Sequence, residues 1–254
     1  MLKKLIKVEF YAVSRIMLPL YLALCGVTAF SFFIYMLPLN EGILKFIPIL
    51  VTTVFTITLI GLMVASIISV LIRFYKNLVT NEGYLMFTLP VKVSDLIFSK
   101  LIVAFSYIMT TILLCIGSFA ILSKATNSPF SFDGLYEEWK LLLSMANVSE
   151  FTLILIVIFF IIFALCCNLL MFYASIALGQ KITKNKVLGA VIGYIIIYMI
   201  YQAVNLTVIL LVFLLKIEPN FLLAVIALLL YMLVIDGILF GIIKNHLTNK
   251  LNLE

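Results

Sequence analysis

Residues 151–180 read FTLILIVIFFIIFALCCNLLMFYASIALGQ, a run of thirty residues without a single charge. About 20 consecutive apolar residues are enough to cross the hydrocarbon core of a bilayer as an α-helix. Apolar and polar residues do not alternate along this run, which excludes a strand of a membrane β-barrel. The stretch therefore predicts a membrane-spanning helix and an all-α membrane protein.

The remainder of the 254-residue chain repeats this pattern, because its charges fall between long apolar runs. Hydrophobic residues make up 65% of the sequence and charged residues only 11%, compared with about 25% charged residues in soluble domains. Such a chain has too few charges to cover a surface that faces water. We predict one transmembrane domain over 1–254 with six spans, at about 16–37, 46–72, 101–122, 151–178, 187–215 and 221–243.

Two segments outside these spans are expected to lie at the membrane surface. In residues 1–15, apolar side chains fall on one helical face and basic ones on the other, which is typical of an interfacial helix. The outer loop 123–150 holds Trp139, the only tryptophan, within a candidate short helix over 134–144 that Asp133 would cap. Both segments are expected to lie near the lipid headgroups.

Basic residues are distributed unevenly between the two sets of loops. The N-terminus, 73–100, 179–186 and the C-terminus carry 13 of the 17 Lys and Arg residues, and the opposite loops carry four. Loops rich in Lys and Arg stay in the cytoplasm. Both termini and the segment 73–100 are therefore expected on the cytoplasmic side. The net charge of +6 follows from this topology and requires no nucleic-acid partner.

The segment 73–100, RFYKNLVTNEGYLMFTLPVKVSDLIFSK, is too polar to span the membrane and too apolar for a simple loop. Thr80 can cap a short helix with Glu82 in its first turn, and Pro90 would end that helix. Two interpretations of this helix are open: a docking element for a soluble partner, or an interfacial helix that anchors the loop. Its apolar face would consist of Tyr84, Leu85, Phe87 and Leu89.

The motifs in this segment resemble the loop between the second and third spans of bacterial ATP-binding-cassette (ABC) type-2 transporter permeases. The similarity lies in RFYKNL (73–78), NEGYL (81–85) and FTLPV (87–91). It implies that the loop carries a coupling helix that fits a groove on an ATPase subunit. The resemblance assigns ATPase coupling to Asn77, Thr80, Glu82, Gly83, Tyr84, Leu85, Phe87 and Pro90.

From the resemblance we expect the permease subunit of an ABC exporter in a bacterial cytoplasmic membrane. Its partners would be an ABC ATPase subunit and a second permease copy or a paralogue. ATP and Mg would bind to the ATPase, and this chain would need no cofactor. The expected cargoes are peptides, antimicrobials and lipid-like molecules. The apolar spans with little intramembrane charge fit an amphipathic or hydrophobic cargo better than an ion. Many family members have re-entrant helices between the fifth and sixth spans. Here the predicted link 216–220 is short. Either residues 208–230 contain a folded-back helix, or this outer cap is reduced or replaced by 123–150.

The sequence contains no recognisable catalytic motif, so we do not expect the chain itself to be an enzyme. It lacks the Gly-x-x-x-x-Gly-Lys-Ser/Thr phosphate loop, the His-Glu-x-x-His zinc motif and the Gly-x-Ser-x-Gly nucleophile motif. The only histidine, His246, lies in the C-terminal tail. The four cysteines lie in apolar runs and are interpreted as packing residues: Cys25, Cys115, Cys166 and Cys167.

Asp236 is the only charged residue inside a predicted span. An acid at mid-membrane costs about 2.5–3.5 kcal/mol on insertion scales. Asp236 would either face a cavity as a proton or substrate site, or be the buried partner of an interfacial Lys or Arg or of Tyr and Asn groups. The lack of a second titratable group in any predicted span argues against a proton relay and favours the structural role.

Three uncharged polar residues also lie within the spans: Asn168, Gln202 and Asn205. They would either line a translocation path or form hydrogen bonds between helices.

Two glycine pairs can bring helices close together: Gly189 with Gly193, and Gly237 with Gly241. We expect these contacts to form within the subunit.

The rival functions are a secondary transporter, a membrane enzyme acting on lipids, and a non-transporting sensor or assembly protein. A secondary transporter would use paired intramembrane ions or broken helices in matching halves, and neither is evident.

Overall fold

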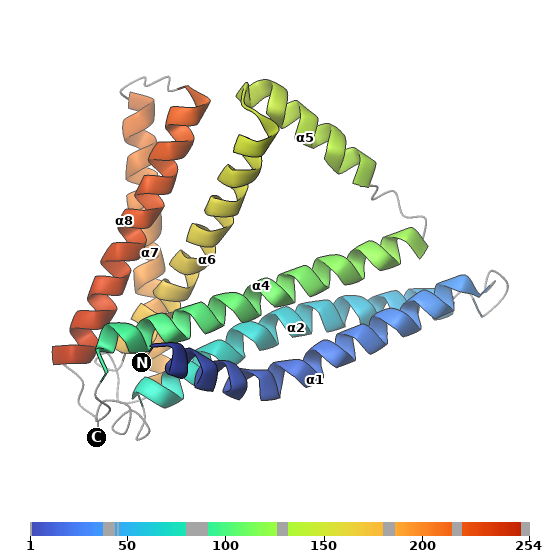
Figure 1. The fold of residues 1–254 in the computed structure, drawn as a ribbon, viewed down its shortest axis with the longest axis horizontal. Coiled ribbons are helices and arrows are strands. Elements are labelled where there is room, and N and C mark those ends of the chain that lie inside the picture. Colours follow the sequence, from blue (N-terminus) through green and yellow to red (C-terminus); the bar gives the residue numbers. More distant parts are fainter. Residues whose placement is uncertain are drawn as a thin grey trace. The chain divides into compact units, whose positions relative to one another are not determined.

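The computed structural model describes residues 2–37, 44, 46–79, 91–125, 132–179, 186–214 and 220–249. These ranges are helical apart from short connecting turns and contain no strand, which confirms the all-α prediction (Figure 1). Six of the helices are long and apolar enough to cross a membrane, as predicted. They are α1 (Leu2–Met36), α2 (Phe46–Val79), α4 (Val93–Ala125), α6 (Glu150–Gly179), α7 (Lys186–Leu214) and α8 (Phe221–Asn249).

Several helices extend beyond the spans that the sequence predicts. The expected interfacial helix and the first span are joined in α1, a single helix that contains Pro19. Helix α2 continues to Val79 and α4 begins at Val93, so both enter the segment predicted to couple to a partner. Within 208–230, the described residues belong to the ends of α7 and α8, and none forms a separate re-entrant helix.

The short helix expected in the outer loop is present as α5 (Phe132–Ala146). It ends at Asn147, whose φ of 50° places it in the left-handed region. The backbone N–H of Asn147 donates to the carbonyl of Leu143 at 3.1 Å, which satisfies one of the last free carbonyls of the helix. Ser149 then caps α6, since its hydroxyl accepts from the backbone N–H of Thr152 at 3.3 Å.

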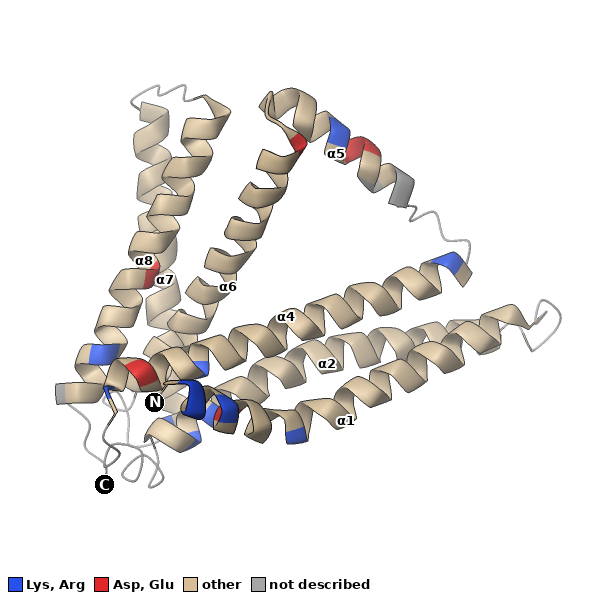
Figure 2. Ribbon diagram, in the orientation of Figure 1, with Lys and Arg blue, Asp and Glu red and all other residues tan. Residues whose placement is uncertain are grey.

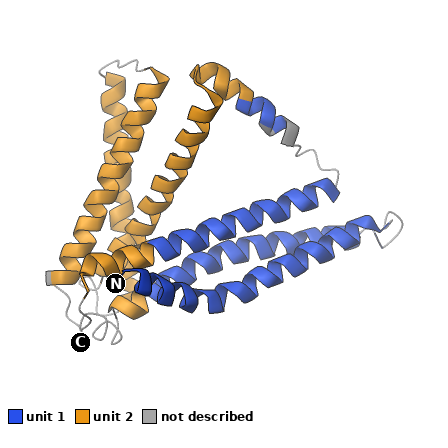
Figure 3. Ribbon diagram, viewed as in Figure 1, with its two compact units in different colours: residues 1–73, 102–139 blue, residues 74–101, 140–254 orange. Residues whose placement is uncertain are grey.

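The chain divides into two compact units (Figure 3). Unit 1 comprises Met1–Arg73 and Ile102–Trp139, and unit 2 comprises Phe74–Leu101 and Lys140–Glu254. Helices α2 and α4 therefore each contribute residues to both units. Charged residues lie mainly near helix ends, and the long helices are otherwise uncharged over most of their length (Figure 2).

The core of unit 1 joins α1 to α2 and α4. One buried cluster contains Val13 and Met17 of α1 with Val103 and Tyr107 of α4. A second cluster is formed by Leu24 of α1, Leu62 of α2 and Cys115 of α4. Cys115 is thus a packing residue, as the sequence predicts.

Unit 2 is built on α6, which packs against both α7 and α8. A Cβ added to Gly179 would lie 2.5 Å from backbone atoms of Gly189, and one added to Gly193 would lie 3.0 Å from the carbonyl oxygen of Ser175. The first glycine pair therefore makes the expected close contact within the subunit. The prediction is wrong for Gly237 and Gly241, which have no described atom of another segment within 4 Å of such a Cβ.

Candidate functional site

The ends of α2 and α4 that flank the expected coupling helix are anchored on α6. Phe74 and Leu78 of α2 are fully buried, and Asn77 is 2% exposed. The ring of Phe74 stacks on Tyr173 of α6 with a centroid distance of 3.9 Å and an interplanar angle of 8°. The Tyr173 hydroxyl donates to the carbonyl of Lys100 of α4 at 3.5 Å, the upper limit for a hydrogen bond. One residue of α6 therefore contacts both flanking helices.

The first turns of α4 are buried in unit 2 in the same way. Leu96 and Ile97 are almost completely buried. Ser99 is 1% exposed, and its hydroxyl donates to the carbonyl of Leu96 at 2.8 Å. The ring of Phe98 lies 4.6 Å from that of Phe240 on α8. We call the buried residues Phe74, Asn77, Leu78, Leu96, Ile97 and Tyr173 the coupling base.

Of the residues assigned to ATPase coupling, Asn77 lies in the coupling base. The other seven lie outside the described residues: Thr80, Glu82, Gly83, Tyr84, Leu85, Phe87 and Pro90. The short helix expected there, and its apolar face, therefore stay predictions. Sequence reasoning missed Tyr173, which gives no local signal because it lies in an apolar run of α6.

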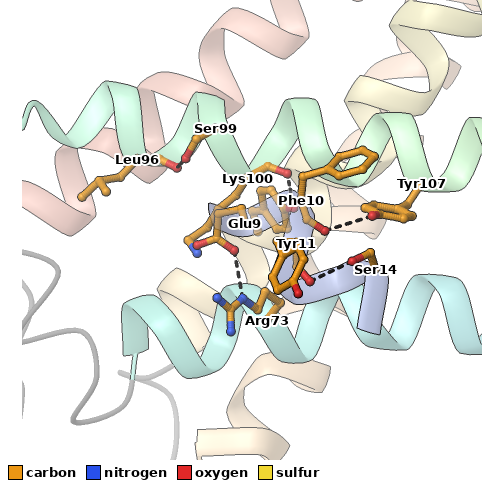
Figure 4. A network of polar contacts seen from close by, with 10 residues as sticks. Glu9, Phe10, Tyr11, Ser14, Arg73, Leu96, Ser99, Lys100 and Tyr107 are labelled. Atoms are coloured by element: carbon orange, nitrogen blue, oxygen red, sulfur yellow. Dashed lines mark hydrogen bonds and ion pairs between the residues drawn. The ribbon is translucent and has the colours of Figure 1, made fainter. Parts of the chain in front are cut away.

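A buried ion pair in unit 1 was also missed from the sequence. Nε of Arg73 on α2 donates to Oε2 of Glu9 on α1 at 2.9 Å, and the Glu9 side chain is only 4% exposed (Figure 4). Next to this pair, the Tyr107 hydroxyl of α4 donates to the carbonyl of Phe10 at 2.9 Å. A signal was present, because Glu9 falls one turn before Val13 on the apolar face of α1. An acid at such a position needs a buried partner.

Two of the four intramembrane polar residues make contacts only within their own helices. The amide of Asn168 donates to the carbonyl of Ala164 at 2.8 Å, and the amide of Gln202 donates to the Tyr198 hydroxyl at 2.8 Å. Both residues are exposed on the surface of unit 2. This geometry gives neither residue an interhelical hydrogen bond.

The other two take part in a polar cluster between helices of unit 2. The Tyr231 hydroxyl of α8 donates to Oδ1 of Asn205 on α7 at 2.6 Å, which is an interhelical hydrogen bond of the expected kind. Asp236 of α8 lies beside the thiol of Cys167 on α6, and Cys167 also neighbours Tyr201 of α7. We call these five residues the Asp236 cluster.

Asp236 itself has little to compensate its charge. Its side chain is half-buried, and Oδ1 is buried without a hydrogen-bond partner among the described residues. No described Lys, Arg or His lies beside the carboxylate. The ion-pair version of the structural interpretation is therefore not supported by the described part of the chain. No three His, Cys, Asp or Glu side chains within that part could together hold a metal ion.

An apolar groove of about 290 Å³ adjoins the Asp236 cluster. Its walls come from α6, α7 and α8, and they include Met171, Ile200 and Ile238. Tyr201 belongs to both the groove and the cluster, and Ile235 and Leu239 line the groove on either side of Asp236 in the sequence of α8. Asp236 itself does not line the groove, so Tyr201 is the residue that connects this apolar space to the cluster with the carboxylate.

Comparison with known proteins gives no match: no protein-family model, no curated protein and no solved structure matches this chain. The functional assignment therefore depends on the motifs of the segment 73–100 and on the geometry described above.

Proposed function

We propose that this chain is the membrane-spanning permease subunit of an ABC exporter, with the ATPase on a separate subunit. Three features support the proposal. The motifs over 73–91 resemble the coupling loop of type-2 permeases, six helices can cross the membrane, and the helices flanking the loop are anchored in unit 2. The cargo would be amphipathic or hydrophobic, such as a peptide, an antimicrobial or a lipid-like molecule.

The coupling base is the observation that carries the proposal. An ATPase that moves a docked loop does work on the transporter only if the loop is attached to rigid elements. Buried and closely packed side chains transmit such movement because they cannot rearrange freely. Phe74 and Lys100 lie at the two sides of the loop, and both contact Tyr173. Since α6 packs on α7 and α8, displacement of the loop would reach three long helices of unit 2.

The proposal places both termini and the coupling loop in the cytoplasm of a bacterial cell. The support is the 13-to-4 distribution of basic residues between the two sets of loops. Single cysteines introduced at Asn127 and Lys184 in a cysteine-free background should react from opposite sides of the membrane. Labelling at position 184 by an impermeant reagent added outside intact cells would contradict this topology.

Co-purification from native membranes tests the assignment. The wild-type chain should bring down an ABC ATPase subunit, and the double variant Tyr84→Ala/Phe87→Ala should bring down much less, because aromatic anchors often dominate such interfaces. A matched control is Tyr136→Ala/Phe151→Ala, which removes the same two ring types from α5 and the start of α6. The control should retain the ATPase at the wild-type level.

A third variant separates docking from transmission. Phe74→Leu keeps most of the buried volume but removes the ring that stacks on Tyr173. It should bind the ATPase normally, while transport per ATP hydrolysed decreases. If the wild-type chain brings down no ATP-binding subunit, the exporter assignment fails, and the secondary-transporter or sensor function takes its place. If the double variant retains both the ATPase and transport, the coupling element lies elsewhere in the chain.

A further inference from the structure

Asp236 is an acid whose charge the described structure leaves unbalanced. The nearest basic residue along α8 is Lys244, eight residues away, which corresponds to about 12 Å of helix rise. Among the described residues, the polar side chain that contacts the carboxylate is Cys167, whose thiol is a weak hydrogen-bond donor. An intramembrane acid of this kind marks a functional site when a cation is able to reach it.

The side chains around Asp236 favour a cation over an anion or a neutral polar group. The hydroxyls of Tyr201 and Tyr231 are close enough to interact electrostatically, and the thiol of Cys167 interacts with both. Tyrosine rings attract cations through the negative face of the π-system. No described cationic side chain competes for this position. The cluster therefore combines a carboxylate with two tyrosine side chains that lie near Cys167, the neighbour of Asp236.

The adjoining groove selects the remainder of the ligand. Its lining side chains are hydrocarbon apart from the thioether of Met171 and the ring and hydroxyl of Tyr201. Its volume of about 290 Å³ is close to the lower end of the range for small-molecule sites, which is about 300–1,000 Å³. Ile200 and Ile238 are 60% and 57% exposed, so the groove is open at the side and a ligand can enter from the lipid. A compact apolar body fits this space.

We propose that α6, α7 and α8 form a binding site for hydrophobic monocations. The apolar body lies in the groove against Ile200, Ile238 and Leu239, and the positive charge lies at Asp236 beside Tyr201 and Tyr231. The site would recognise an amphipathic amine or a quaternary onium ion, and it would reject an anion of the same shape. Asp236 gains the counter-ion that the described chain does not supply.

This inference names a cargo class and thus deepens the proposed function, but its test does not require an ATPase. The full-length chain is purified and reconstituted alone in lipid nanodiscs. Binding of radiolabelled tetraphenylphosphonium is measured by equilibrium dialysis against empty nanodiscs, which correct for partition into lipid. We expect saturable binding at one site per chain. The isosteric anion tetraphenylborate should neither bind saturably nor compete.

Five variants test where the cation binds: three change an acid, and two introduce tryptophan on α8. Asp236→Asn removes the charge at nearly constant volume and should weaken binding at least about tenfold, whereas Asp236→Glu should retain it. The control Glu150→Gln removes one acid from the exposed start of α6 and should bind as the wild type does. Ile238→Trp fills the groove and should abolish binding, and Leu233→Trp adds the same bulk to an exposed position of α8 outside the groove.

Unchanged binding by Asp236→Asn, equal binding of the borate anion, or the absence of saturable binding by the wild type would each overturn the proposal. If Asp236→Asn does not fold, the tryptophan pair decides, because equal affinity of Ile238→Trp and Leu233→Trp excludes the groove. Failure of this assay leaves ATPase co-purification unaffected. Conversely, a chain that binds the cation but no ATPase would retain this site and lose the exporter assignment.

Discussion

The helices within unit 1 and the helices within unit 2 are joined mainly by contacts of different kinds. In unit 1, polar side chains connect helices: Arg73 pairs with Glu9 at 2.9 Å, and the Tyr21 hydroxyl lies 3.0 Å from the carbonyl of Tyr107 and 2.9 Å from the Thr111 hydroxyl. In unit 2, the Tyr231 hydroxyl also donates to Asn205 between two helices, but most of the close helix contacts involve glycine and stacked rings. Examples are the contact of α6 with Gly193 and the stacking of Phe172 on Tyr194 at 4.5 Å.

This difference affects how strictly the helices of each unit are positioned. Hydrogen bonds and ion pairs have specific geometry, so the polar contacts of unit 1 favour one arrangement of its helices. Ring stacking and glycine contacts depend on shape, and among the described residues Asp236 has no charged partner. The described helices of unit 1 are therefore joined by contacts of more specific geometry than those of unit 2.

The largest expected effect comes from breaking the ion pair of unit 1. Arg73→Met should lower the free energy of unfolding by about 3 kcal/mol, because it removes the guanidinium from a buried carboxylate. The measurement is reversible unfolding in mixed micelles. Arg15→Met is the control, since Arg15 is exposed on α1 and contacts only the ring of Tyr11 among its described neighbours, with a guanidinium-to-centroid distance of 5.0 Å.

The control should lose less than about 1 kcal/mol. The double variant Glu9→Met/Arg73→Met should be more stable than Arg73→Met, because the buried carboxylate that lost the guanidinium is removed as well. Equal stability of Arg73→Met and the wild type would show that unit 1 does not depend on its polar contacts.

A smaller effect is expected from blocking the close approach of helices in unit 2. Gly179→Ala places a Cβ 2.5 Å from backbone atoms of Gly189 and should cost about 1–3 kcal/mol by overpacking. Gly237→Ala makes the same change where no described atom lies within 4 Å, and it should be neutral or stabilising by up to about 1 kcal/mol. Thermal unfolding of both variants in nanodiscs provides the comparison, and equal melting temperatures would contradict the packing described for α6 and α7.

The smallest effect compares one tyrosine hydroxyl from each unit. Tyr21→Phe removes an interhelical hydrogen bond of unit 1 and should cost about 1 kcal/mol. Tyr198→Phe removes a hydroxyl that accepts only from Gln202 on the same helix, so stability should change by less than about 0.5 kcal/mol. The two free energies are measured under the same micelle conditions. A larger loss for Tyr198→Phe would reverse the contrast between the units.

Much of the architecture could be predicted from residue order alone. Six helices able to span a membrane, the short helix α5 and the close contact at Gly193 all follow from local patterns that need no tertiary information. Gly237 and Gly241 show the limit of such patterns. A small-residue spacing permits a close approach, but whether another helix lies there depends on the whole arrangement of the unit.

The functional residues divide in the same way. The coupling segment and Asp236 stood out from the sequence because a Glu-Gly-Tyr motif and a lone intramembrane acid are local features. Tyr173 did not, because it lies in an apolar run, and Glu9 was overlooked although its position on the apolar face of α1 was a local signal. Their importance comes from partners at a sequence distance of more than 60 residues, Lys100 and Arg73 respectively.

The sequence by itself determined that this chain spans the membrane as six helices, since burial in lipid depends on the length and polarity of each segment alone. Only the tertiary structure decided that α6 anchors both helices flanking the loop, that Arg73 pairs with Glu9, and that Asp236 has no such partner within the part of the chain that the structure describes. The physical reason is that lipid solvates an apolar helix face regardless of its neighbours. A buried charge or a stacked ring is stabilised only by the particular group that folding brings against it.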